Sequence, residues 1–267
     1  MRTTRPLLRW AGSKRSAMAH LVENMPSDFN QYVEPFVGSA ALFFALEPRA
    51  AVLSDLNPDL INFYKVLQQH PLSIHNDFSM LERSRETYVE IRFRFSSEED
   101  PYQRAVQFVY LNRNCFNGLY RTNKRGQFNV PFAERGRAQY PTVEDFKSAA
   151  ELTRNANLVV ADFRQVIDER VMANDLVYLD PPYLLSEGRI FTEYVKGHFC
   201  KQDMDDLSCC LRTINARGAK FIVSFIDDPI IDEIKGEWNF ISYEVQRNIS
   251  GFAAARKRYP ELLIKNW

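Results

Sequence analysis

The chain has 267 residues, of which 45% are hydrophobic and 13% aromatic, so it can bury a substantial core and is not a disordered polypeptide. Its 34 basic and 34 acidic residues give a formal net charge of zero, which argues against a protein that coats nucleic acid with a uniformly basic surface. This balance is compatible with a local basic surface, because phosphate contacts depend on where the charge lies.

The cysteines and histidines show no spacing typical of a metal site, so we expect no bound metal and reduced thiols. No apolar run approaches the roughly 20 residues that span a membrane. The N-terminal residues are basic but lack the apolar stretch of a signal peptide. We therefore expect a cytoplasmic protein that has no membrane association and acts as a monomer.

Five short apolar runs, each followed by a helical pattern, predict the parallel strands of a doubly wound α/β sheet. These runs are Tyr32–Phe36, Ala51–Ser54, Leu158–Ala161, Leu176–Leu179 and Lys220–Ser224. Near the C-terminus, Phe240–Val245 and Glu261–Lys265 predict a pair of strands that closes the sheet.

The alternation of strands and helices stops between about Pro58 and Pro141. Residues 100–112 have an apolar stripe typical of a helix, and a turn-rich stretch follows up to residue 137. Thr142 with Asp145 three residues later is typical of a helix start, where regular structure resumes. We predict a catalytic domain of residues 1–57 and 146–267, interrupted by a helical domain of residues 58–145.

The predicted strand Leu176–Leu179 runs directly into Asp180, Pro181, Pro182 and Tyr183. In open α/β sheets, ligands bind at the carboxyl ends of the strands. The exocyclic nitrogen of adenine is a weak nucleophile, because its lone pair is delocalised into the ring. The Asp180 side chain and the Pro181 carbonyl can accept hydrogen bonds from its two hydrogens and so help the nitrogen rehybridise toward a methyl donor. The two prolines stiffen this turn, and Tyr183 offers a flat face for an extruded base.

A more ordinary interpretation makes Asp180 a helix cap and Tyr183 a core residue. The complete Asp-Pro-Pro-Tyr sequence at the end of a buried strand favours the catalytic interpretation.

A turn of small residues follows the first predicted strand, from Phe36 through Gly38 to Ala41. Such a turn lets the backbone approach a bound cofactor closely. Asp55 ends the next strand, where a carboxylate can accept hydrogen bonds from two ribose hydroxyls. Taken alone, Asp55 could equally cap the helix that follows.

These motifs resemble a known family. Asp-Pro-Pro-Tyr at 180–183 resembles the catalytic motif of amino-group DNA methyltransferases, and the Asp variant is typical of the adenine-N6 class. The segments 8–14 (LRWAGSK) and 33–38 (VEPFVG) resemble the opening motifs of the Dam-type family, and the similarity continues through 111–132 and 261–263 (ELL). The order of the motifs resembles the alpha group. The resemblance implies a Rossmann-like S-adenosylmethionine-dependent methyltransferase sheet with an inserted helical target-recognition domain.

The resemblance also implies the cofactor, S-adenosylmethionine, and the residues that hold it. Trp10 and Lys14 would wrap its methionine end, with the Lys14 charge suited to the carboxylate. Asp162 and Phe163 would border its adenine through a hydrogen bond and stacking. Asp180 would contact both cofactor and substrate.

The chain departs from the family pattern at Ser13 and Ala40, where glycines are frequent. Because alanine does not readily adopt a positive φ, we expect this departure to affect the loop conformation and the affinity for the cofactor.

Residues 112–137 predict a DNA-facing surface, with cations for phosphates, Asn and Arg for base edges, and aromatic rings for stacking or wedging. Six basic residues face one acid, Glu134, in this stretch: Arg113, Arg121, Lys124, Arg125, Arg135 and Arg137. The alternative is a solvated basic loop, and we expect Phe128 and Phe132 in the core.

By the family resemblance, residues 116–121 (FNGLYR) correspond to the hairpin that enters duplex DNA. Phe116 would intercalate, and Leu119, Arg121 and Pro131 would face bases. Residues 92–95 (RFRF) and 256–258 (RKR) would grip the DNA backbone. The expected DNA-binding residues are Arg9, Arg92, Arg94, Asn112, Arg113, Phe116, Asn117, Leu119, Arg121, Lys124, Asn129 and Pro131.

We therefore expect a site-specific enzyme that methylates N6 of adenine in duplex DNA, within 5′-GATC, by base flipping. Rival interpretations keep the fold and change the substrate to cytosine N4 or to adenine in RNA, or make the chain a catalytically silent DNA-binding regulator. Cytosine-N4 enzymes usually carry Ser before the two prolines, and duplex RNA hides its major groove. The sequence leaves open whether the protein is solitary, part of a restriction-modification system, or carried by a phage.

Overall fold

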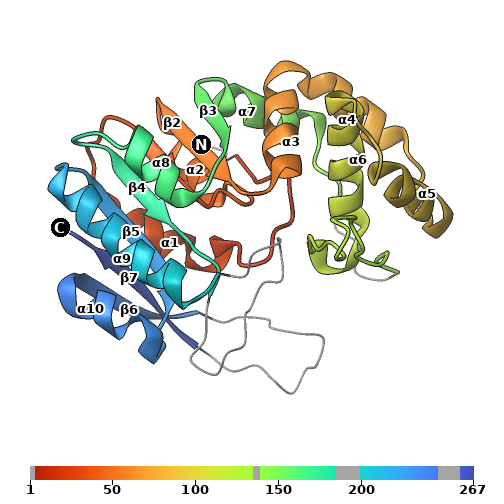
Figure 1. Ribbon diagram of the computed structural model, residues 1–267. Coiled ribbons are helices and arrows are strands. Elements are labelled where there is room, and N and C mark those ends of the chain that lie inside the picture. The colour runs from red at the N-terminus through yellow and green to blue at the C-terminus, as the bar shows by residue number, and fades with distance from the viewer. Residues whose placement is uncertain (1–3, 135–138, 184–198, 246–258) are drawn as a thin grey trace.

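A computed structural model of the chain describes residues 4–134, 139–183, 199–245 and 259–267. Its centre is a seven-stranded sheet with the strand order β3-β2-β1-β4-β5-β7-β6 (Figure 1). Strands β1 to β5 are parallel, whereas β7 runs antiparallel to both β5 and β6. The strand order reverses between β1 and β4, and this switch point is where open α/β sheets bind ligands. The predicted Rossmann-like methyltransferase sheet is confirmed.

The predicted strands are present, with ends that differ by one or two residues, as is usual for element boundaries. Their bounds are β1 Tyr32–Glu34, β2 Ala51–Asp55, β3 Ala156–Val160, β4 Leu176–Leu179, β5 Lys220–Ile226, β6 Asn239–Val245 and β7 Tyr259–Lys265. The expected C-terminal pair, β6 and β7, is confirmed as an antiparallel pair.

The parallel strands β1, β2, β4 and β5 are buried on both faces, which explains why they read as continuous apolar runs, whereas the edge strand β3 is partly exposed. Tyr32 and Tyr178 point into one core, whereas their chain neighbours Val33 and Val177 point into the other. One face is covered by α8 (Phe163–Arg170), α9 (Lys201–Ala216) and α10 (Asp232–Glu237), which follows η3 (Pro229–Ile231). The opposite face carries η1 (Lys14–Ala17), α1 (Met18–Glu23) and α2 (Ala41–Leu46).

A group of helices follows β2 and lies beside the sheet in Figure 1. Its members are α3 (Pro58–Gln69), α4 (Pro71–Met80), α5 (Arg85–Phe95), α6 (Pro101–Asn114) and the short η2 (Phe116–Gly118). The helix expected over residues 100–112 is α6, and it begins where the Asp100 side chain accepts a hydrogen bond from the Gln103 amide (2.7 Å).

Helix α7 (Val143–Thr153) begins with the predicted capping box, in which Thr142 and Asp145 exchange side-chain and backbone hydrogen bonds. This helix packs against α3 and α4, and it leads into the edge strand β3. A continuous hydrophobic core joins one face of the sheet to these helices, because Tyr32 and Leu53 belong to the same cluster as Phe63 and Phe108.

Candidate active site

The carboxyl ends of four neighbouring parallel strands carry acidic side chains. Glu34 ends β1, Asp55 ends β2, Asp162 follows β3 by two residues, and Asp180 directly follows β4. Parallel register brings these strand ends to one edge of the sheet, on both sides of the switch point. This edge is the candidate site.

Asp180 is paired with Lys14 from the N-terminal segment. The Nζ atom of Lys14 lies 2.5 Å from Oδ1 of Asp180 and also donates to the Gly12 carbonyl at 3.3 Å. The same Nζ atom lies 4.8 Å from the centre of the Tyr183 ring. Lys14 therefore joins the two ends of the Asp-Pro-Pro-Tyr sequence.

The Lys14–Asp180 pair is shielded from solvent, with 5% of the lysine side chain and 20% of the aspartate side chain exposed. Burial opposes the positive charge, but the Asp180 carboxylate outweighs this cost and raises the pKa of Lys14 above its ordinary value. Lys14 therefore stays charged at neutral pH and presents a fixed cation to the site.

Tyr183 is 5% exposed, and its ring meets that of Phe225 at 5.1 Å in an edge-on arrangement. The Tyr183 ring is therefore part of the hydrophobic core in this structure, as expected from the interpretation that makes Tyr183 a core residue. Stacking between Tyr183 and an extruded base requires that the surrounding side chains move.

The turn between β1 and α2 packs tightly against Trp10. Gly38 has a φ of +45°, and a Cβ atom at this position would lie 2.7 Å from Cδ1 of Trp10. The Gly38 carbonyl accepts a hydrogen bond from the buried Tyr64 hydroxyl at 3.0 Å. Only glycine meets both conditions at position 38, a left-handed backbone and a close neighbour.

Asp55 reaches back to this turn instead of capping α3. Its carboxylate accepts hydrogen bonds from the backbone amides of Gly38 (3.2 Å) and Asn57 (3.0 Å), whereas Asn57 itself caps α3. Burial raises the pKa of Asp55 to about 6, although these amides favour its charged form. The capping alternative for Asp55 is excluded by this geometry.

The two departures from the family pattern both lie in this loop region. Ala40 adopts a left-handed conformation, with φ +54° and ψ +33°, so the expectation that alanine would avoid positive φ here is wrong. Tight packing explains the strain, because Ala40 is fully buried and its carbonyl accepts the Phe44 amide at 3.0 Å. The Ser13 hydroxyl, where the family usually has glycine, lies 3.4 Å from that of Ser39.

Asp162 and Phe163 lie next to the same turn. The Asp162 side chain caps α8 through the Arg164 amide (2.9 Å), and the Phe163 ring packs 5.3 Å from that of Phe36. Phe163 is 3% exposed, whereas the Asp162 side chain is 34% exposed. The structure thus brings together all of the expected cofactor residues at this edge of the sheet.

Two participants at this edge were not identified from the sequence. Glu34 is 3% exposed and accepts a hydrogen bond from the Tyr32 hydroxyl at 3.0 Å. Burial raises its pKa well above the ordinary range of a carboxyl group. Its position at a strand end is the signal that could have found it, since Asp55 and Asp180 share that position. Arg164 carries no comparable signal, because two of its three carboxylate partners, Asp203 and Asp206, lie 39 and 42 residues further along the chain.

The stretch from Cys115 to Phe132 folds back on itself, as expected, with antiparallel bridges between these two residues and between Thr122 and Phe128. The Asn123 side chain accepts the amides of Arg125 and Gln127 and so shapes the tip. We refer to residues 115–132 as the hairpin.

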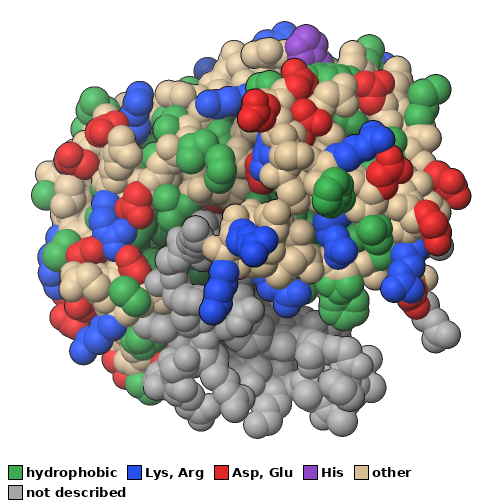
Figure 2. Space-filling model, turned by 45° about the vertical axis from the view of Figure 1, so that its right-hand side comes forward, with side chains coloured by type: hydrophobic (Ala, Val, Ile, Leu, Met, Phe, Trp, Pro, Cys, Tyr) green, Lys and Arg blue, Asp and Glu red, His purple; other side chains and the backbone are tan. Residues whose placement is uncertain are grey.

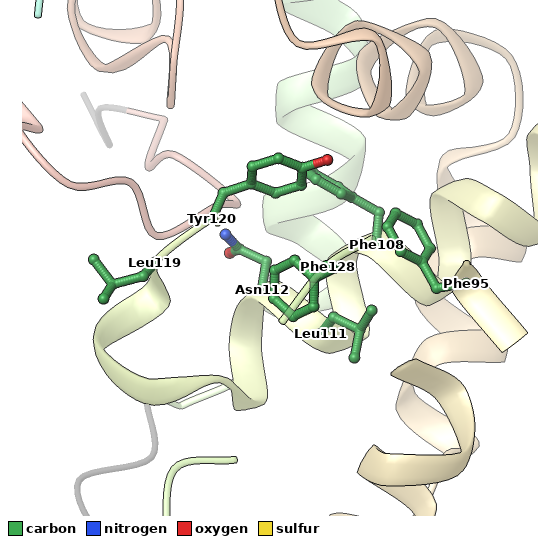
Figure 3. A pocket seen from close by; sticks show the side chains of 7 residues that line it. All are labelled: Phe95, Phe108, Leu111, Asn112, Leu119, Tyr120 and Phe128. Atoms are coloured by element: carbon green, nitrogen blue, oxygen red, sulfur yellow. The ribbon is translucent and has the colours of Figure 1, made fainter. Parts of the chain in front are cut away.

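Seven side chains hold the hairpin against α5 and α6 (Figure 3). They are Phe95, Phe108, Leu111, Asn112, Leu119, Tyr120 and Phe128, and the space between them leaves no room for a water molecule. Phe128 is 6% exposed and Phe132 is partly buried, so both serve the core as expected. This cluster is packing and not a binding pocket.

Several expected DNA-binding residues are exposed on or near the hairpin. The exposed residues of the hairpin are Phe116, Asn117, Arg121, Lys124 and Pro131, and Arg94 is exposed on α5. The partly buried residues are Arg9, Arg92, Leu119 and Asn129. Phe116 is 49% exposed, which is high for a phenylalanine. Arg121 donates to the Asn129 side chain at 2.8 Å. On the face drawn in Figure 2, Lys and Arg side chains gather near the centre.

Three of these arginines already have partners or neighbours. Arg94 pairs with Glu90 one turn earlier on α5, and Arg92 donates to the Val130 carbonyl at 3.3 Å. Arg9 packs directly under Gly118, where an added Cβ atom would lie 2.3 Å from Cβ of Arg9. Residues 256–258, expected to grip the DNA backbone, lie outside the described residues.

Asn112 and Arg113 are interior residues, which corrects their expected place on the DNA-facing surface. Asn112 is 3% exposed and exchanges two hydrogen bonds with the Arg9 backbone, at 2.8 and 2.7 Å. Arg113 is 7% exposed and donates to the carbonyls of Leu7 and Gln139. Both side chains fasten α6 to the N-terminal segment and are buried within the protein.

Among the described residues, no helix is long and apolar enough to cross a membrane, and no group of side chains has the composition of a metal site. The described cysteines are all free.

Residues 10–249 match the family of D12 class N6 adenine-specific DNA methyltransferases. Similar proteins include the type II methyltransferase M1.LlaDCHI of Lactococcus lactis subsp. cremoris, which is 32% identical over 98% of this chain and 95% of its own length. The type II methyltransferase M.MjaIII of Methanocaldococcus jannaschii is 36% identical over 82% of this chain and 83% of its own. A DNA adenine methylase of Serratia marcescens is 34% identical over 98% of both chains. With a Rossmann-like sheet and Asp180 at its switch point, the chain belongs to this family and is an adenine-specific DNA methyltransferase.

Proposed function

We propose that this enzyme transfers the methyl group of S-adenosylmethionine to N6 of the adenine in 5′-GATC of duplex DNA, after that adenine has been flipped out of the helix. Membership of the family implies S-adenosylmethionine as the donor and DNA as the substrate. The observation that supports the chemistry best is the buried Lys14–Asp180 pair at the switch point, beside the Gly38 turn.

The residues present fit the cofactor. Asp55 lies beside the Gly38 turn and has further lone pairs for two ribose hydroxyls. Trp10 covers Gly38, and Phe36 with Phe163 forms an aromatic wall next to Asp162. The bound cofactor supplies an electrophilic methyl group on a sulfonium centre.

Lys14 can serve the cofactor and Asp180 together. An ammonium group has three donors, of which Lys14 uses one for Asp180 and one for the Gly12 carbonyl. The third N–H donor of Lys14 would then bind the methionine carboxylate of the cofactor. In its pair with the positively charged Lys14, the Asp180 carboxylate serves as a hydrogen-bond acceptor.

In the proposed reaction, Asp180 accepts a hydrogen bond from the adenine amino group and the Pro181 carbonyl accepts the other. These contacts draw the nitrogen lone pair out of conjugation with the ring, and the lone pair attacks the methyl carbon. As the new N–C bond forms, the bond between the methyl carbon and the sulfonium sulfur would break and leave its electron pair on a neutral thioether sulfur, and the amino nitrogen would then release one proton to solvent. Preorganised acceptors in a site closed to water make this step faster. Pro182 stiffens the turn, and Tyr183 stacks on the base once the side chains around it have moved.

The DNA surface that we propose combines the hairpin with α5, within an inserted DNA-binding domain of residues 58–145. Phe116 is exposed and suits insertion between bases, whereas Asn117, Arg121, Lys124, Asn129 and Pro131 line the same hairpin. Arg92 and Arg94 would contact phosphates.

The 5′-GATC target is supported by residue types. Arg9 and Arg121 suit the O6 and N7 atoms of the two guanines, and Leu119 and Pro131 suit a thymine methyl group. One guanidinium nitrogen of Arg9 is shielded from solvent and has no hydrogen-bond partner among the described residues, so a base edge would satisfy it.

The test is to methylate unmodified plasmid with the purified monomer and to map the product by modified-base sequencing. We expect N6-methyladenine at every GATC and equal activity with and without EDTA. Methylated cytosine, modified RNA alone, or a different motif would contradict the corresponding part of the proposal. Light scattering with bound DNA checks that one protein molecule acts on each site.

A further inference from the structure

Arg164 stands at the centre of a charged cluster beside the aromatic wall of the site. Its Nη1 atom lies 3.0 Å from both carboxylate oxygens of Asp162, and its Nε atom donates to Asp206 at 2.7 Å. Its Nη2 atom donates to Asp203. One guanidinium in the first turn of α8 thus binds a side chain at the end of β3 and two side chains in the first turns of α9.

This arrangement holds Asp162 in one orientation. Both of its oxygens face Arg164, and the Arg164 backbone amide donates to the same carboxylate at 2.9 Å. A carboxylate has about four acceptor positions, so Asp162 can take a further donor from the pocket side. Its side chain is 34% exposed, which leaves it accessible.

The cluster has three carboxylates and one cation, so only the positive charge of Arg164 offsets the repulsion between the carboxylates within it. Burial opposes the charge of Asp203, but the hydrogen bond from Arg164 outweighs it and lowers the pKa of Asp203. Hydrogen bonds from Gln202 and then Arg164 lower the pKa of Asp206. Without the guanidinium, Asp162 would face two like charges and would turn away from them.

Arg164 also contacts the aromatic wall directly. Its guanidinium carbon lies 4.4 Å from the centre of the Phe163 ring, and Phe163 packs against both Phe36 (5.3 Å) and Phe199 (6.3 Å). The same side chain therefore fixes a hydrogen-bond acceptor and one ring of the aromatic wall at one end of the site. Phe163 is 3% exposed, so its ring stacks on a bound adenine only after the neighbouring side chains have moved. An adenine ring needs both features, one for its amino group and one for its face.

We propose that Arg164 is a positioning residue that sets the enzyme's preference for a cofactor with a 6-amino purine. It does so by keeping the Asp162 carboxylate aimed at the exocyclic amino group of the cofactor adenine. This inference rests on the proposed function, in which Asp162 borders that adenine. A 6-oxo purine presents lone pairs at the same place, so a fixed carboxylate repels it.

The test measures calorimetric dissociation constants for two ligands, S-adenosyl-L-homocysteine and its 6-oxo counterpart S-inosyl-L-homocysteine. The variants are Arg164→Gln, the conservative Arg164→Lys, and Arg212→Gln as a matched control. Arg212 also pairs with a carboxylate, Glu237, from α9, but on an exposed surface away from the site.

We expect the wild type to bind the adenosyl compound at least about tenfold more tightly than the inosyl compound, because only the adenosyl compound donates a hydrogen bond from its 6-amino group to the Asp162 carboxylate. Arg164→Gln should lose about tenfold in affinity for the adenosyl compound only, so that the preference disappears. Arg164→Lys should retain an intermediate preference, and Arg212→Gln should match the wild type. If Arg164→Gln does not fold, Arg164→Lys alone decides, through the ratio of the two constants.

The outcomes separate this inference from the proposed function. Equal loss for both ligands, or an unchanged ratio in Arg164→Gln and Arg164→Lys, would assign Arg164 a purely structural role and overturn the inference. A wild type that methylates DNA but does not discriminate between the ligands would overturn it as well, with the proposed reaction intact. A wild type that binds neither ligand and does not methylate DNA would overturn the proposed function itself.

Discussion

The ammonium group of Lys14 lies 2.5 Å from the carboxylate of Asp180, a residue 166 positions further along the chain. This pair joins the N-terminal segment to the end of β4 and places a fixed positive charge beside the residues proposed to bind the substrate. It also explains why Lys14 is buried without loss of its charge.

The first prediction concerns Asp180. Asp180→Ala should abolish methyl transfer, and Asp180→Asn should slow it by at least about 10²–10³, the usual effect of losing one preorganised contact in a dry site. Transfer of a tritiated methyl group to duplex DNA, under single-turnover conditions, measures this. An unchanged far-ultraviolet circular dichroism spectrum is the control for a folded protein. Near-wild-type transfer by Asp180→Ala would rule out the proposed role.

The second prediction concerns the cofactor ribose. Asp55→Ala should weaken binding of S-adenosyl-L-homocysteine by about 1–3 kcal/mol, because two hydroxyls lose their acceptor. Calorimetry at pH 8, where Asp55 is ionised, gives the difference. An unchanged affinity in a folded variant would remove Asp55 from the cofactor site.

The third prediction is a pH dependence of stability that also centres on Asp55. Its pKa of about 6 in the folded protein exceeds the ordinary value of 3.8, so the folded state binds a proton that the unfolded state releases between about pH 4 and 6. The contribution of Asp55 to the free energy of unfolding should therefore fall as the pH rises through this window, by up to about 3 kcal/mol. It should then stay constant above pH 6.

Urea unfolding of the wild type and of Asp55→Asn at several pH values from 4 to 8 tests this. The stability of the wild type relative to Asp55→Asn should decrease from pH 4 to 6. If the difference between the two proteins does not change with pH, Asp55 has an ordinary pKa.

The fourth prediction separates strain from packing in the cofactor turn. Gly38→Ala and Gly126→Ala both place alanine at a positive φ, which costs about 1–2 kcal/mol. Only Gly38→Ala also meets Trp10, whereas nothing lies within 4 Å of the added Cβ atom at Gly126. Gly38→Ala should therefore lose more stability, change the tryptophan fluorescence and weaken cofactor binding. Equal losses of stability in the two variants would show that the Trp10 side chain moves aside without a measurable loss of free energy of unfolding.

The fifth prediction concerns the reading of the DNA sequence. Arg121→Ala should relax specificity at an outer base pair of GATC, because a bidentate contact with guanine contributes about 1–3 kcal/mol of discrimination. Lys124→Ala, at the exposed tip of the same hairpin, is the matched control and should weaken binding to all sequences alike.

Modified-base sequencing of DNA from a methylation-free host that expresses each variant distinguishes these effects. If Arg121→Ala keeps the motif and only lowers the yield, Arg121 contacts phosphate and not a base.

Local patterns in the sequence predicted most of the fold. The apolar runs that became β1, β2, β4 and β5 could be identified without knowledge of their neighbours in the sheet, because a strand buried on both faces is apolar throughout. The capping box of Thr142 and Asp145 likewise depends on residues three positions apart. Asp180 was identifiable as a site residue because it follows an apolar strand within a distinctive motif.

The sequence by itself therefore determined the strands of the sheet, the helices that interrupt their alternation and the Asp-Pro-Pro-Tyr sequence at the end of β4, since each is encoded within a few neighbouring residues. Tertiary structure alone decided which polar residues meet. It paired Lys14 with Asp180, buried Asn112 against the Arg9 backbone and gathered distant carboxylates around Arg164. The physical reason is that the role of a polar side chain depends on its burial and its partners, and these partners lie on other elements, up to 166 residues away.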